Sequence, residues 1–273
     1  MSAPPRILAI AGSDSSGGAG VQADIKTITT LGGYAMTAIT AVTAQNTIGV
    51  QGIAPMGGEI VARQIASCFD DIGVDAVKIG MLHDADIIEA VASALPEDGP
   101  PLVLDPVMVA TSGAALIAED AVEAMRARLF GRAALLTPNL PELQWLMGRD
   151  TLPDTDAINA AALELAVETG AAVLAKGGHT NDNRIVDILV RPGGETIRFD
   201  HARIDTPHTH GTGCTLSSAI ATLLAHGQEL PHAVRLARNY VRQAIIAAPG
   251  FGQGNGPLGH GQVGRVPERQ GKS

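Results

Sequence analysis

The sequence predicts a doubly wound α/β fold, with helices on both faces of a mainly parallel central sheet. Short apolar runs of strand length alternate along the chain with longer helical patterns, at roughly 30 residues per unit. Most of the short runs are apolar throughout, as strands must be when helices cover both faces of their sheet. No linker-like segment interrupts the first 248 residues, so the units are expected to form one domain.

The strands are expected at the short apolar runs and the helices between them. The expected strands are residues 6–11, 38–43, 75–80, 102–106, 133–137, 171–176 and 185–190. Residues 196–200 are expected to add an antiparallel edge strand, because the preceding RPGGE segment predicts a tight turn. The expected helices are residues 18–31, 58–72, 84–95, 119–129, 155–168, 213–226 and 231–248. The glycine-rich residues that follow are expected to form a loop and a tail.

Composition limits the classes of function. The chain has 273 residues, 45% hydrophobic and 17% charged, which is enough apolar material for a buried core. Its net charge of −9 argues against nucleic-acid binding, which depends on neutralising phosphates with Lys and Arg. Cys68 and Cys214 are too few for a disulfide framework or a four-thiolate zinc site. With no signal peptide and no apolar run of membrane length, we expect a soluble cytoplasmic protein.

The first strand-end loop is rich in glycine and hydroxyl side chains. It runs from Gly12 to Gly20 and opens the first helix, where exposed N–H groups bind anions or polar ligands. The segment from Gly18 to Ala23 also matches the loose G-x-G-x-x-A dinucleotide pattern, although the acidic residue expected about 20 residues later is missing. The alternative is a plain helix entry with Ser and Gly caps, in which Asp24 favours the helix dipole.

Polar side chains follow four more strands, and each has a structural alternative. Gln45 offers the complement of an aminopyrimidine edge or an amide, or is a turn residue. Asp105 is a candidate to hold a metal or metal-bound water, or is a turn carboxylate. Asn139 and Glu142 supply oxygen ligands suited to Mg²⁺, but their spacing also fits a capping box. Lys176 precedes two glycines, where it either places a charge beside phosphates or ends a strand.

The segment DTPHTHGTGC, residues 205–214, gives the sharpest chemical prediction. The N–H groups of residues 211–214 can face an oxyanion at the start of a long helix, whose dipole favours negative charge. Such a loop would neutralise a phosphoryl group in transfer, and the Cys214 thiol is expected to have a lowered pKa. The alternative is a glycine-capped core helix with a buried cysteine. The sequence has no Walker A motif, so any nucleotide chemistry is not that of a P-loop.

The motifs jointly resemble those of the hydroxymethylpyrimidine/phosphomethylpyrimidine kinases of thiamine biosynthesis, within the ribokinase-like superfamily. The resemblance runs from about residue 7 to residue 260. It rests on eight segments in order, AGSDSSGGAGVQADIKT, TAVTAQNTIGVQG, KIGML, LDPVM, TPNLPE, KGGH, THGTGC and NGPLGH. Each segment is weak evidence alone, whereas the ordered set is highly specific.

The resemblance implies a three-layer αβα ribokinase-like fold, with a mainly parallel central sheet between two helical layers. It implies a single kinase domain at residues 1–260, followed by a flexible tail at 261–273. The implied reaction is ATP-dependent phosphorylation, with Mg²⁺, of 4-amino-5-hydroxymethyl-2-methylpyrimidine to its monophosphate and then to the diphosphate. A homodimer is also expected from the resemblance.

The resemblance also implies roles for particular residues. Substrate-binding roles fall on Gly12, Asp24, Gln45, Met81 and Val107, with Gln45 on the aminopyrimidine and Asp24 beside the substrate hydroxyl. Metal-associated roles fall on Asp105, Asn139 and Glu142. Nucleotide-binding roles fall on Lys176, Thr209, His210, Gly211 and Gly213. Catalytic roles fall on Gly211, Gly213 and Cys214, the last standing where sugar kinases of the superfamily carry an aspartate base.

Three alternatives stay open. A pyridoxal or pyridoxine kinase, or an enzyme with both activities, would use the same motifs, although pyridoxal-directed relatives vary at the position of Gln45. A dinucleotide-dependent oxidoreductase lacks its ribose-binding acid. A non-catalytic binding protein of this fold would have no need of an intact GTGC loop together with Asn139 and Glu142.

Overall fold

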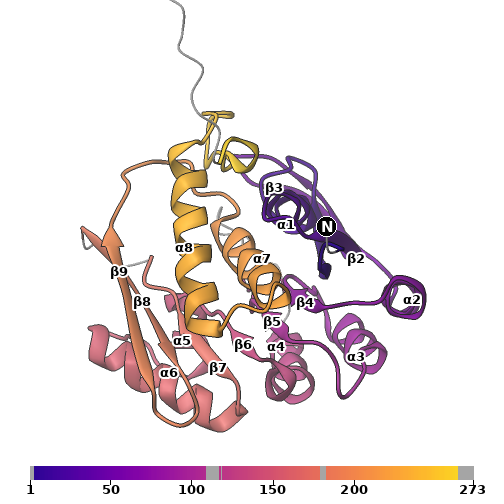
Figure 1. Cartoon of the computed structure of the whole chain (residues 1–273), viewed down its shortest axis with the longest axis horizontal. Helices are drawn as coiled ribbons and strands as arrows, with labels where there is room; N and C mark the ends of the chain where they lie inside the picture. The colour runs from indigo at the N-terminus through magenta and orange to yellow at the C-terminus, as the bar shows by residue number, and fades with distance from the viewer. Residues whose placement is uncertain (1–2, 109–116, 118, 179–182, 264–273) are drawn as a thin grey trace, which may run out of the picture.

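The computed structural model describes residues 3–108, 117, 119–178 and 183–263, and this part of the chain builds one nine-stranded sheet (Figure 1). The strand order is β3-β2-β1-β4-β5-β6-β7-β8-β9. The six central strands, β2-β1-β4-β5-β6-β7 in spatial order, are parallel. Strands β3, β8 and β9 each run antiparallel to the strand before them in sequence. The strands are β1 Arg6–Asp14, β2 Tyr34–Gln45, β3 Val50–Pro55, β4 Ala76–Ile79, β5 Leu102–Leu104, β6 Leu135–Leu136, β7 Ala172–Ala175, β8 Arg184–Val190 and β9 Thr196–Ala202.

Helices cover both faces of the sheet. One face carries α1 Gly20–Thr30, α7 Thr212–Ala225 and α8 Leu230–Ile246, and Figure 1 shows α7 and α8 in front of the strands. The other face carries α2 Gly58–Ser67, α3 Ala85–Ala94, α4 Glu119–Arg128, α5 Leu140–Leu146 and α6 Thr155–Thr169. The expected three-layer α/β fold is therefore confirmed.

Strand β1 shows why the sheet needs two covering layers. Leu8 and Ile10 pack into the core under α2 and α3, and Ile7 and Ala9 pack into the core under α1 and α7. All four side chains are fully buried. Burying a Leu or Ile stabilises a fold by about 1.5–3 kcal/mol, so the unbroken apolar run from Ile7 to Ala11 in β1 favours a strand covered on both sides.

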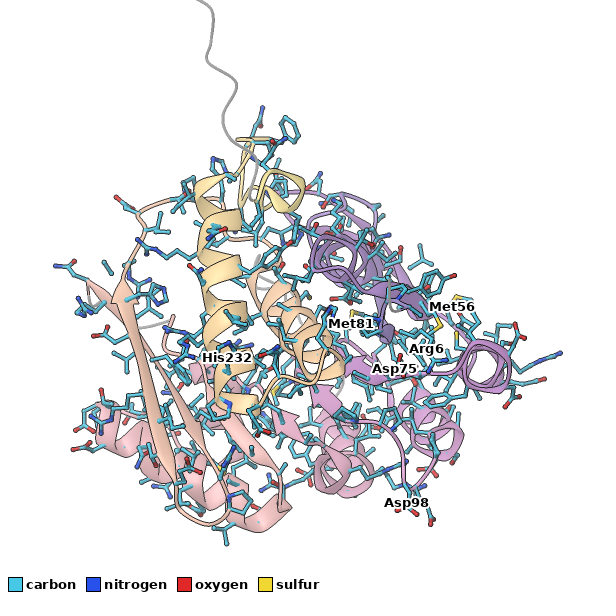
Figure 2. The ribbon with its side chains drawn as sticks, in the orientation of Figure 1. Arg6, Met56, Asp75, Met81, Asp98 and His232 are labelled. Carbon is cyan, nitrogen blue, oxygen red and sulfur yellow. The ribbon has the colours of Figure 1, made fainter. Side chains whose placement is uncertain are left out.

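The strand order changes direction at β1, because successive strands are added first on one side of β1 and then on the other. This topological switch point determines where the site lies. It passes from β1 to β2 on one side and later returns to place β4 on the other side of β1. In open sheets of this kind, ligands bind at the carboxyl ends of the strands beside such a reversal. At the opposite edge, Arg6 donates from Nη2 to Asp75 Oδ1 at 2.7 Å and ties β1 to β4 (Figure 2).

The departures from the predicted elements have local causes. Strand β3 was not predicted, because VQGIAP is mostly exposed and contains Gly and Pro, so it lacks an apolar strand pattern. Helix α5 was missing from the predicted helices because it has only seven residues, although its start at Asn139 was expected. Residues 58–72 form α2 and then a π-helical turn, Cys68–Ile72, rather than one helix. The antiparallel edge strand expected at 196–200 is confirmed as β9.

Candidate active site

A cavity of about 1060 Å³ lies along the carboxyl ends of the parallel strands. Loops that are far apart in the sequence meet there, because parallel strands all end at the same edge of a sheet. The predicted site residues that line it are Gly12, Gln45, Met81, Asp105, Val107, Asn139, Glu142, Lys176, Thr209, His210, Gly211, Gly213 and Cys214. Only Asp24 among the predicted residues is not part of this lining.

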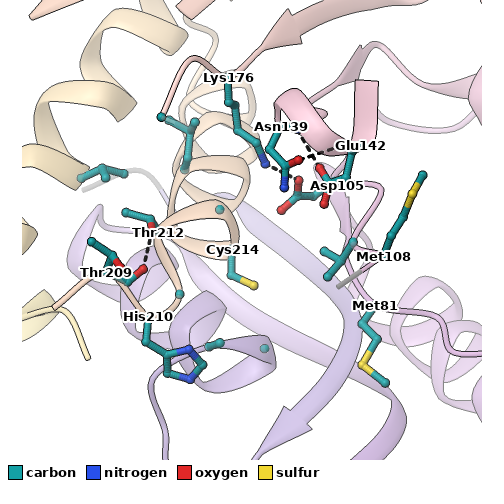
Figure 3. Close-up of a pocket in the computed structure, with 18 of the residues that line it drawn as sticks. Met81, Asp105, Met108, Asn139, Glu142, Lys176, Thr209, His210, Thr212 and Cys214 are labelled. Atoms are coloured by element: carbon teal, nitrogen blue, oxygen red, sulfur yellow. Dashed lines mark hydrogen bonds and ion pairs between the residues drawn. The ribbon is translucent and has the colours of Figure 1, made fainter. Parts of the chain in front are cut away.

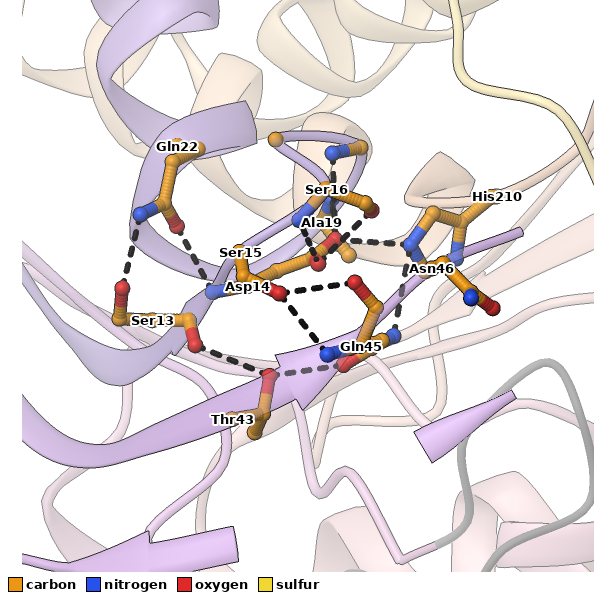
Figure 4. Close-up of polar contacts among 12 residues, drawn as sticks. Ser13, Asp14, Ser15, Ser16, Ala19, Gln22, Thr43, Gln45, Asn46 and His210 are labelled. Carbon is orange, nitrogen blue, oxygen red and sulfur yellow. Dashed lines mark hydrogen bonds and ion pairs between the residues drawn. The ribbon is translucent and has the colours of Figure 1, made fainter. Parts of the chain in front are cut away.

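The Asp14 carboxylate organises the first loop (Figure 4). Its Oδ1 accepts hydrogen bonds from the Ser16 N–H and hydroxyl, both at 2.8 Å, and its Oδ2 accepts the Ala19 N–H at 2.8 Å. The His210 Nε2 atom also lies 2.8 Å from Oδ2. Burial acts to raise the pKa of Asp14, but these hydrogen bonds outweigh it and the pKa is lowered. Asp14 was not among the predicted site residues, and its place in the GSDSSGG segment was the only signal for it.

The GTGC loop forms the roof of the cavity at the start of α7. Gly211 has φ of +84°, and a Cβ there would lie 1.9 Å from the Gly18 carbonyl oxygen, so only glycine fits against the first loop. A Cβ on Gly213 would lie 3.1 Å from Asp105 Oδ2 and 3.4 Å from Lys176 Nζ. The bare backbone of Gly213 therefore leaves room for a ligand between the helix start and these two charged groups (Figure 3).

Lys176 and Asp105 form a buried ion pair beneath this loop. Lys176 Nζ lies 2.8 Å from Asp105 Oδ1, which also accepts the Thr137 hydroxyl at 3.0 Å. Burial acts to lower the pKa of Lys176, but the carboxylates of Asp105 and Glu142 prevail and raise it. The site thus holds a fixed positive charge next to the N–H groups at the start of α7.

Asn139 and Glu142 form the capping box that was the structural alternative. Asn139 Oδ1 accepts the Glu142 N–H at 2.9 Å, and Glu142 Oε2 accepts the Asn139 N–H at 2.7 Å. Glu142 also faces the cavity, where burial, opposed by Lys176 and reinforced by Asp105, raises its pKa to about 7. The same two residues therefore start α5 and place a second carboxylate beside Asp105.

The oxygen donors in this corner are compatible with Mg²⁺ but do not form a closed cage. Among the described residues, no group of three or more His, Cys, Asp or Glu side chains could hold a metal ion. Asp105 and Glu142 provide two carboxylates, and the amide oxygen of Asn139 already accepts a helix N–H. Mg²⁺ commonly keeps several waters and takes only one or two carboxylates plus substrate phosphates, so this donor set fits it.

The Cys214 thiol differs from the prediction. Burial, reinforced by the carboxylates of Asp24 and Asp105, outweighs the helix start and the Lys78 charge and raises the pKa of Cys214 to about 11. A lowered pKa had been expected from the helix dipole alone. The thiol is therefore protonated at neutral pH in this state of the protein.

Asp24 is also placed differently from the prediction. It is fully buried in α1, where both carboxylate oxygens lie 3.0 Å from Lys78 Nζ and Oδ1 accepts the Ser218 hydroxyl at 2.6 Å. This pairing holds the pKa of Lys78 above its ordinary value. Asp24 is thus not part of the cavity lining, and Lys78 and Ser218 hold its carboxylate within the fold. Lys78, in the KIGML segment, was not singled out from the sequence.

The far end of the cavity lies over β8, β9 and α8. Arg238 donates from Nε to Asp187 Oδ2 at 2.6 Å, and Asp187 Oδ1 accepts the Gly177 N–H at 2.8 Å. Asp187 therefore ties α8 to the loop that carries Lys176. The apolar lining at this end is Ile185, Ile204, Val241 and Ile245. Sequence reasoning missed these residues, because nothing local indicates that α8 returns to the ends of β7 and β8.

Two sequence-based predictions fall partly on residues that the structure does not describe. His179 of the KGGH segment lies outside the described residues, and so does most of the predicted tail, from residue 264 onward. Within the described part of the chain, no helix is long and apolar enough to cross a membrane.

Comparison with known proteins adds to this geometry. Residues 14–259 match the model of a family described as phosphomethylpyrimidine kinase. The chain is 48% identical over 258 residues to the hydroxymethylpyrimidine/phosphomethylpyrimidine kinase of Streptomyces coelicolor, covering 94% of this chain and 95% of the relative. It is 47% identical over 255 residues to the thiamine biosynthesis bifunctional protein ThiED of Geobacter sulfurreducens, covering 93% of this chain and 52% of the relative.

A solved structure with the same fold is that of a pyridoxal kinase. The pyridoxal kinase of Staphylococcus aureus, in complex with AMP-PCP and pyridoxal, matches with a TM-score of 0.88 at 30% sequence identity. The match covers 97% of this chain and 96% of that one.

Proposed function

This chain belongs to the phosphomethylpyrimidine kinase family, and from that premise we propose how its cavity performs two successive phosphorylations. The enzyme is a hydroxymethylpyrimidine/phosphomethylpyrimidine kinase of thiamine biosynthesis that uses ATP. It phosphorylates the hydroxymethyl group of 4-amino-5-hydroxymethyl-2-methylpyrimidine and then converts the monophosphate to the diphosphate. The observation that carries the proposed mechanism is the Asp105–Lys176 pair beneath the N–H groups of the GTGC loop.

The length of the cavity supports two ligands placed end to end. Gln45 is the last residue of β2 and Lys176 follows β7, and five strand spacings separate these strands, on the order of 24 Å. We assign the pyrimidine to the end that holds Gln45, where Gly12, Met81 and Val107 supply the other contacts. The nucleotide lies toward β8 and α8, and its terminal phosphate approaches Gly213.

The transferred phosphoryl group is stabilised by groups already in position. The Thr212 N–H already donates to the Thr209 carbonyl oxygen at 3.2 Å, so the proposal assigns the N–H groups of Gly211, Gly213 and Cys214 and the Lys176 ammonium to the developing negative charge. The dipole of α7 adds to them. Thr209 extends this nucleotide-binding loop in the proposal, whereas the His210 side chain faces Asp14 and Gln45 and is assigned to the pyrimidine end. The acceptor changes from a hydroxyl in the first step to a phosphate in the second, so only the first step needs a proton removed. Cys214 is the proposed recipient of that proton, and because only a thiolate can accept it, the proposal requires ligand binding to lower the pKa of the thiol from about 11.

Mg²⁺ belongs to the same proposal. Asp105 and Glu142 would hold it, and Asn139 would keep Glu142 in place through the capping box. When bound, the ion would neutralise phosphate charge beside the transferred group. Lys176 would then neutralise part of the charge on the same carboxylates.

A homodimer is proposed from the exposed apolar edge of the sheet. Val42 on β2 is 47% exposed, and Ala44 and Ala54 lie exposed on β2 and β3. An exposed apolar face of this kind is a usual site of association. Analytical ultracentrifugation of the wild type and of Val42→Glu tests this, with a dimer expected for the first and a monomer for the second. A single kinase domain over residues 1–260 and a cytoplasmic location complete the proposal.

An ATP-consumption assay with Mg²⁺ tests the activity. The hydroxymethylpyrimidine, its monophosphate and pyridoxal are offered separately, and the products are identified by mass. Successive appearance of the pyrimidine mono- and diphosphate is expected. Turnover of pyridoxal alone would replace the substrate assignment with the pyridoxal kinase alternative. Binding of the pyrimidine without turnover would indicate a non-catalytic protein, and binding of a reduced nicotinamide would indicate an oxidoreductase.

A further inference from the structure

The side-chain amide of Gln45 is held between two polar neighbours at the edge of the cavity (Figure 4). In the orientation drawn there, its Oε1 lies 3.1 Å from Thr43 Oγ1 and its Nε2 lies 3.4 Å from His210 Nε2. His210 Nε2 is also 2.8 Å from Asp14 Oδ2, and Thr43 Oγ1 is also 3.1 Å from the Ser13 carbonyl oxygen. Each neighbour of the amide is therefore itself held by another partner.

The hydrogens in this network can be assigned from chemistry. Asp14, with its lowered pKa, is an ionised carboxylate that only accepts, so the hydrogen of its 2.8 Å contact lies on His210 Nε2. The Ser13 carbonyl oxygen likewise only accepts, and it takes the Thr43 hydroxyl hydrogen. The one hydrogen of His210 Nε2 is engaged with Asp14 and this nitrogen has no lone pair in the ring plane, so toward Gln45 it can only share that hydrogen with an acceptor. Thr43 Oγ1 has a lone pair left to accept.

A planar amide satisfies both neighbours in one orientation. Its oxygen must face the His210 Nε2–H and its nitrogen must face Thr43, a half-turn from the orientation drawn in Figure 4. The opposite orientation sets an N–H of Gln45 against the N–H of His210 and competes with Ser13 for the single Thr43 hydrogen.

The His210 ring is itself fixed in position. It is 5% exposed, and a Cβ on Gly18 would lie 2.3 Å from its Cδ2, so the ring packs directly on the backbone of the first loop. Its backbone N–H donates to the Gly256 carbonyl oxygen at 3.2 Å. In Figure 3 the ring lies across the GTGC loop from Lys176, away from the charged pair.

We infer that Asp14, His210 and Thr43 form a specificity-determining relay that fixes the orientation of the Gln45 amide. This inference rests on the proposed function. The fixed amide keeps one N–H and one oxygen lone pair for a ligand, side by side. An aminopyrimidine edge offers the complement, a ring nitrogen that accepts beside an amino group that donates. Pyridoxal has no such adjacent pair, so the relay favours the pyrimidine.

Conservative substitutions on both sides of the amide test the relay. His210→Met removes the donor, whereas His210→Gln keeps an N–H near the position of Nε2. Thr43→Val removes the acceptor without changing the shape, whereas Thr43→Ser keeps it. We expect His210→Met and Thr43→Val to lower kcat/KM for the hydroxymethylpyrimidine about tenfold, the size of one hydrogen bond, mainly through KM. The KM for ATP and kcat/KM for pyridoxal should stay within about twofold, and the Gln and Ser variants should retain at least half of wild-type kcat/KM.

Four outcomes separate the hypotheses. Equal losses in the paired variants, or a loss confined to the KM for ATP, would overturn the relay. If His210→Met fails to fold, as a melting curve would show, the Thr43 pair decides alone. A wild-type enzyme that turns over pyridoxal and not the pyrimidine would instead overturn the proposed function, which the wild-type control reveals before any variant is made.

Discussion

Lys176 Nζ and Asp105 Oδ1 lie 2.8 Å apart although their strands, β7 and β5, are not neighbours. Strand β6 lies between them and contributes Thr137, whose hydroxyl donates to the same oxygen of Asp105. Three consecutive strand ends thus converge on one carboxylate. Gly213, at the start of α7, lies directly above this point. The Lys176–Asp105 ion pair therefore lies at the carboxyl ends of the strands, between α7 of one helical layer and α5 of the other.

Replacing Lys176 tests whether this charge acts on the transferred phosphoryl group. Lys176→Met should lower kcat by about 100- to 1000-fold, as expected for loss of one group that stabilises the transition state. Steady-state kinetics with both pyrimidine acceptors measure it. Arg63→Met, on the exposed face of α2, is the matched loss of a surface cation and should leave kcat unchanged. An equal loss in the two variants would contradict the assignment.

Gly213 is expected to be required because the absence of a side chain leaves space for a phosphate, and not because glycine is flexible. In Gly213→Ala the new Cβ occupies the space 3.1 Å from Asp105 Oδ2, where a phosphate would lie, so kcat/KM should fall on the order of 100-fold. Stability should change by less than about 1 kcal/mol, because alanine favours a helix over glycine while its Cβ crowds the Asp105 carboxylate. Assays and urea denaturation of the same protein measure both effects. Gly193→Ala, with no atom within 4 Å of its Cβ, is the control.

The placement of the cavity residues could be predicted because it follows from topology. Thirteen of the fourteen predicted site residues line one cavity, since each lies near or just after the carboxyl end of a parallel strand or at the start of α7. Asp24 is the exception, because its position one turn into α1 directs it down toward Lys78 rather than out toward the cavity. The sequence shows which residues sit at strand ends but not which of them find a charged partner inside the fold.

Relationships over long sequence distances could not be predicted. Asp14 meets His210 across 196 residues, and Asp187 meets Arg238 across 51. Neither pair has a local pattern, since each depends on how loops cross at the sheet edge. The pKa of Cys214 was predicted in the wrong direction for the same reason: the helix start is visible in sequence, and the burial that outweighs it is not.

The buried Lys78–Asp24 pair should dominate the stability of the cavity floor. Both side chains are fully buried, so Lys78→Met leaves an uncompensated carboxylate and should lower the free energy of unfolding by about 3–5 kcal/mol. Urea denaturation measures the loss. The double variant with Asp24→Asn removes the leftover charge and should recover part of that loss. A double variant less stable than Lys78→Met alone would show that the pair is not the cause.

The raised pKa of Cys214 should make its thiol react slowly with alkylating reagents. With a pKa of about 11, about one thiol in a thousand is ionised at pH 8, so alkylation by iodoacetamide should be about 100-fold slower than for an ordinary cysteine. The rate should rise about tenfold per pH unit up to pH 10. A Cys68→Ser background isolates the signal in mass spectra. Alkylation at the ordinary rate at pH 7 would restore the original prediction of a lowered pKa.

Loss of the Cys214 thiol should separate the two steps of the reaction. If ligand binding brings Cys214 to the thiolate form, Cys214→Ser replaces this proton acceptor with a hydroxyl that stays protonated, so phosphorylation of the hydroxyl should suffer more than phosphorylation of the monophosphate. Single-turnover rates for each acceptor measure the ratio. Equal losses in both steps would assign Cys214 to the anion site alone.

His260 should make the protein sensitive to acid. Burial, with the nearby charge of Lys26, lowers its pKa to about 4 from the ordinary 6.5, while the ring accepts or donates a bond with Thr215 Oγ1 at 2.8 Å. Between pH 6.5 and about pH 4, His260 is protonated in the unfolded chain but stays neutral in the folded protein. This group therefore lowers the free energy of unfolding increasingly as the pH falls to about 4. The shift corresponds to about 3 kcal/mol. Urea denaturation from pH 7 to pH 4 should show His260→Gln losing about that much less stability than the wild type. His232→Gln, on α8, is the matched control and should follow the wild-type curve, and a His260→Gln curve parallel to it would contradict the assignment.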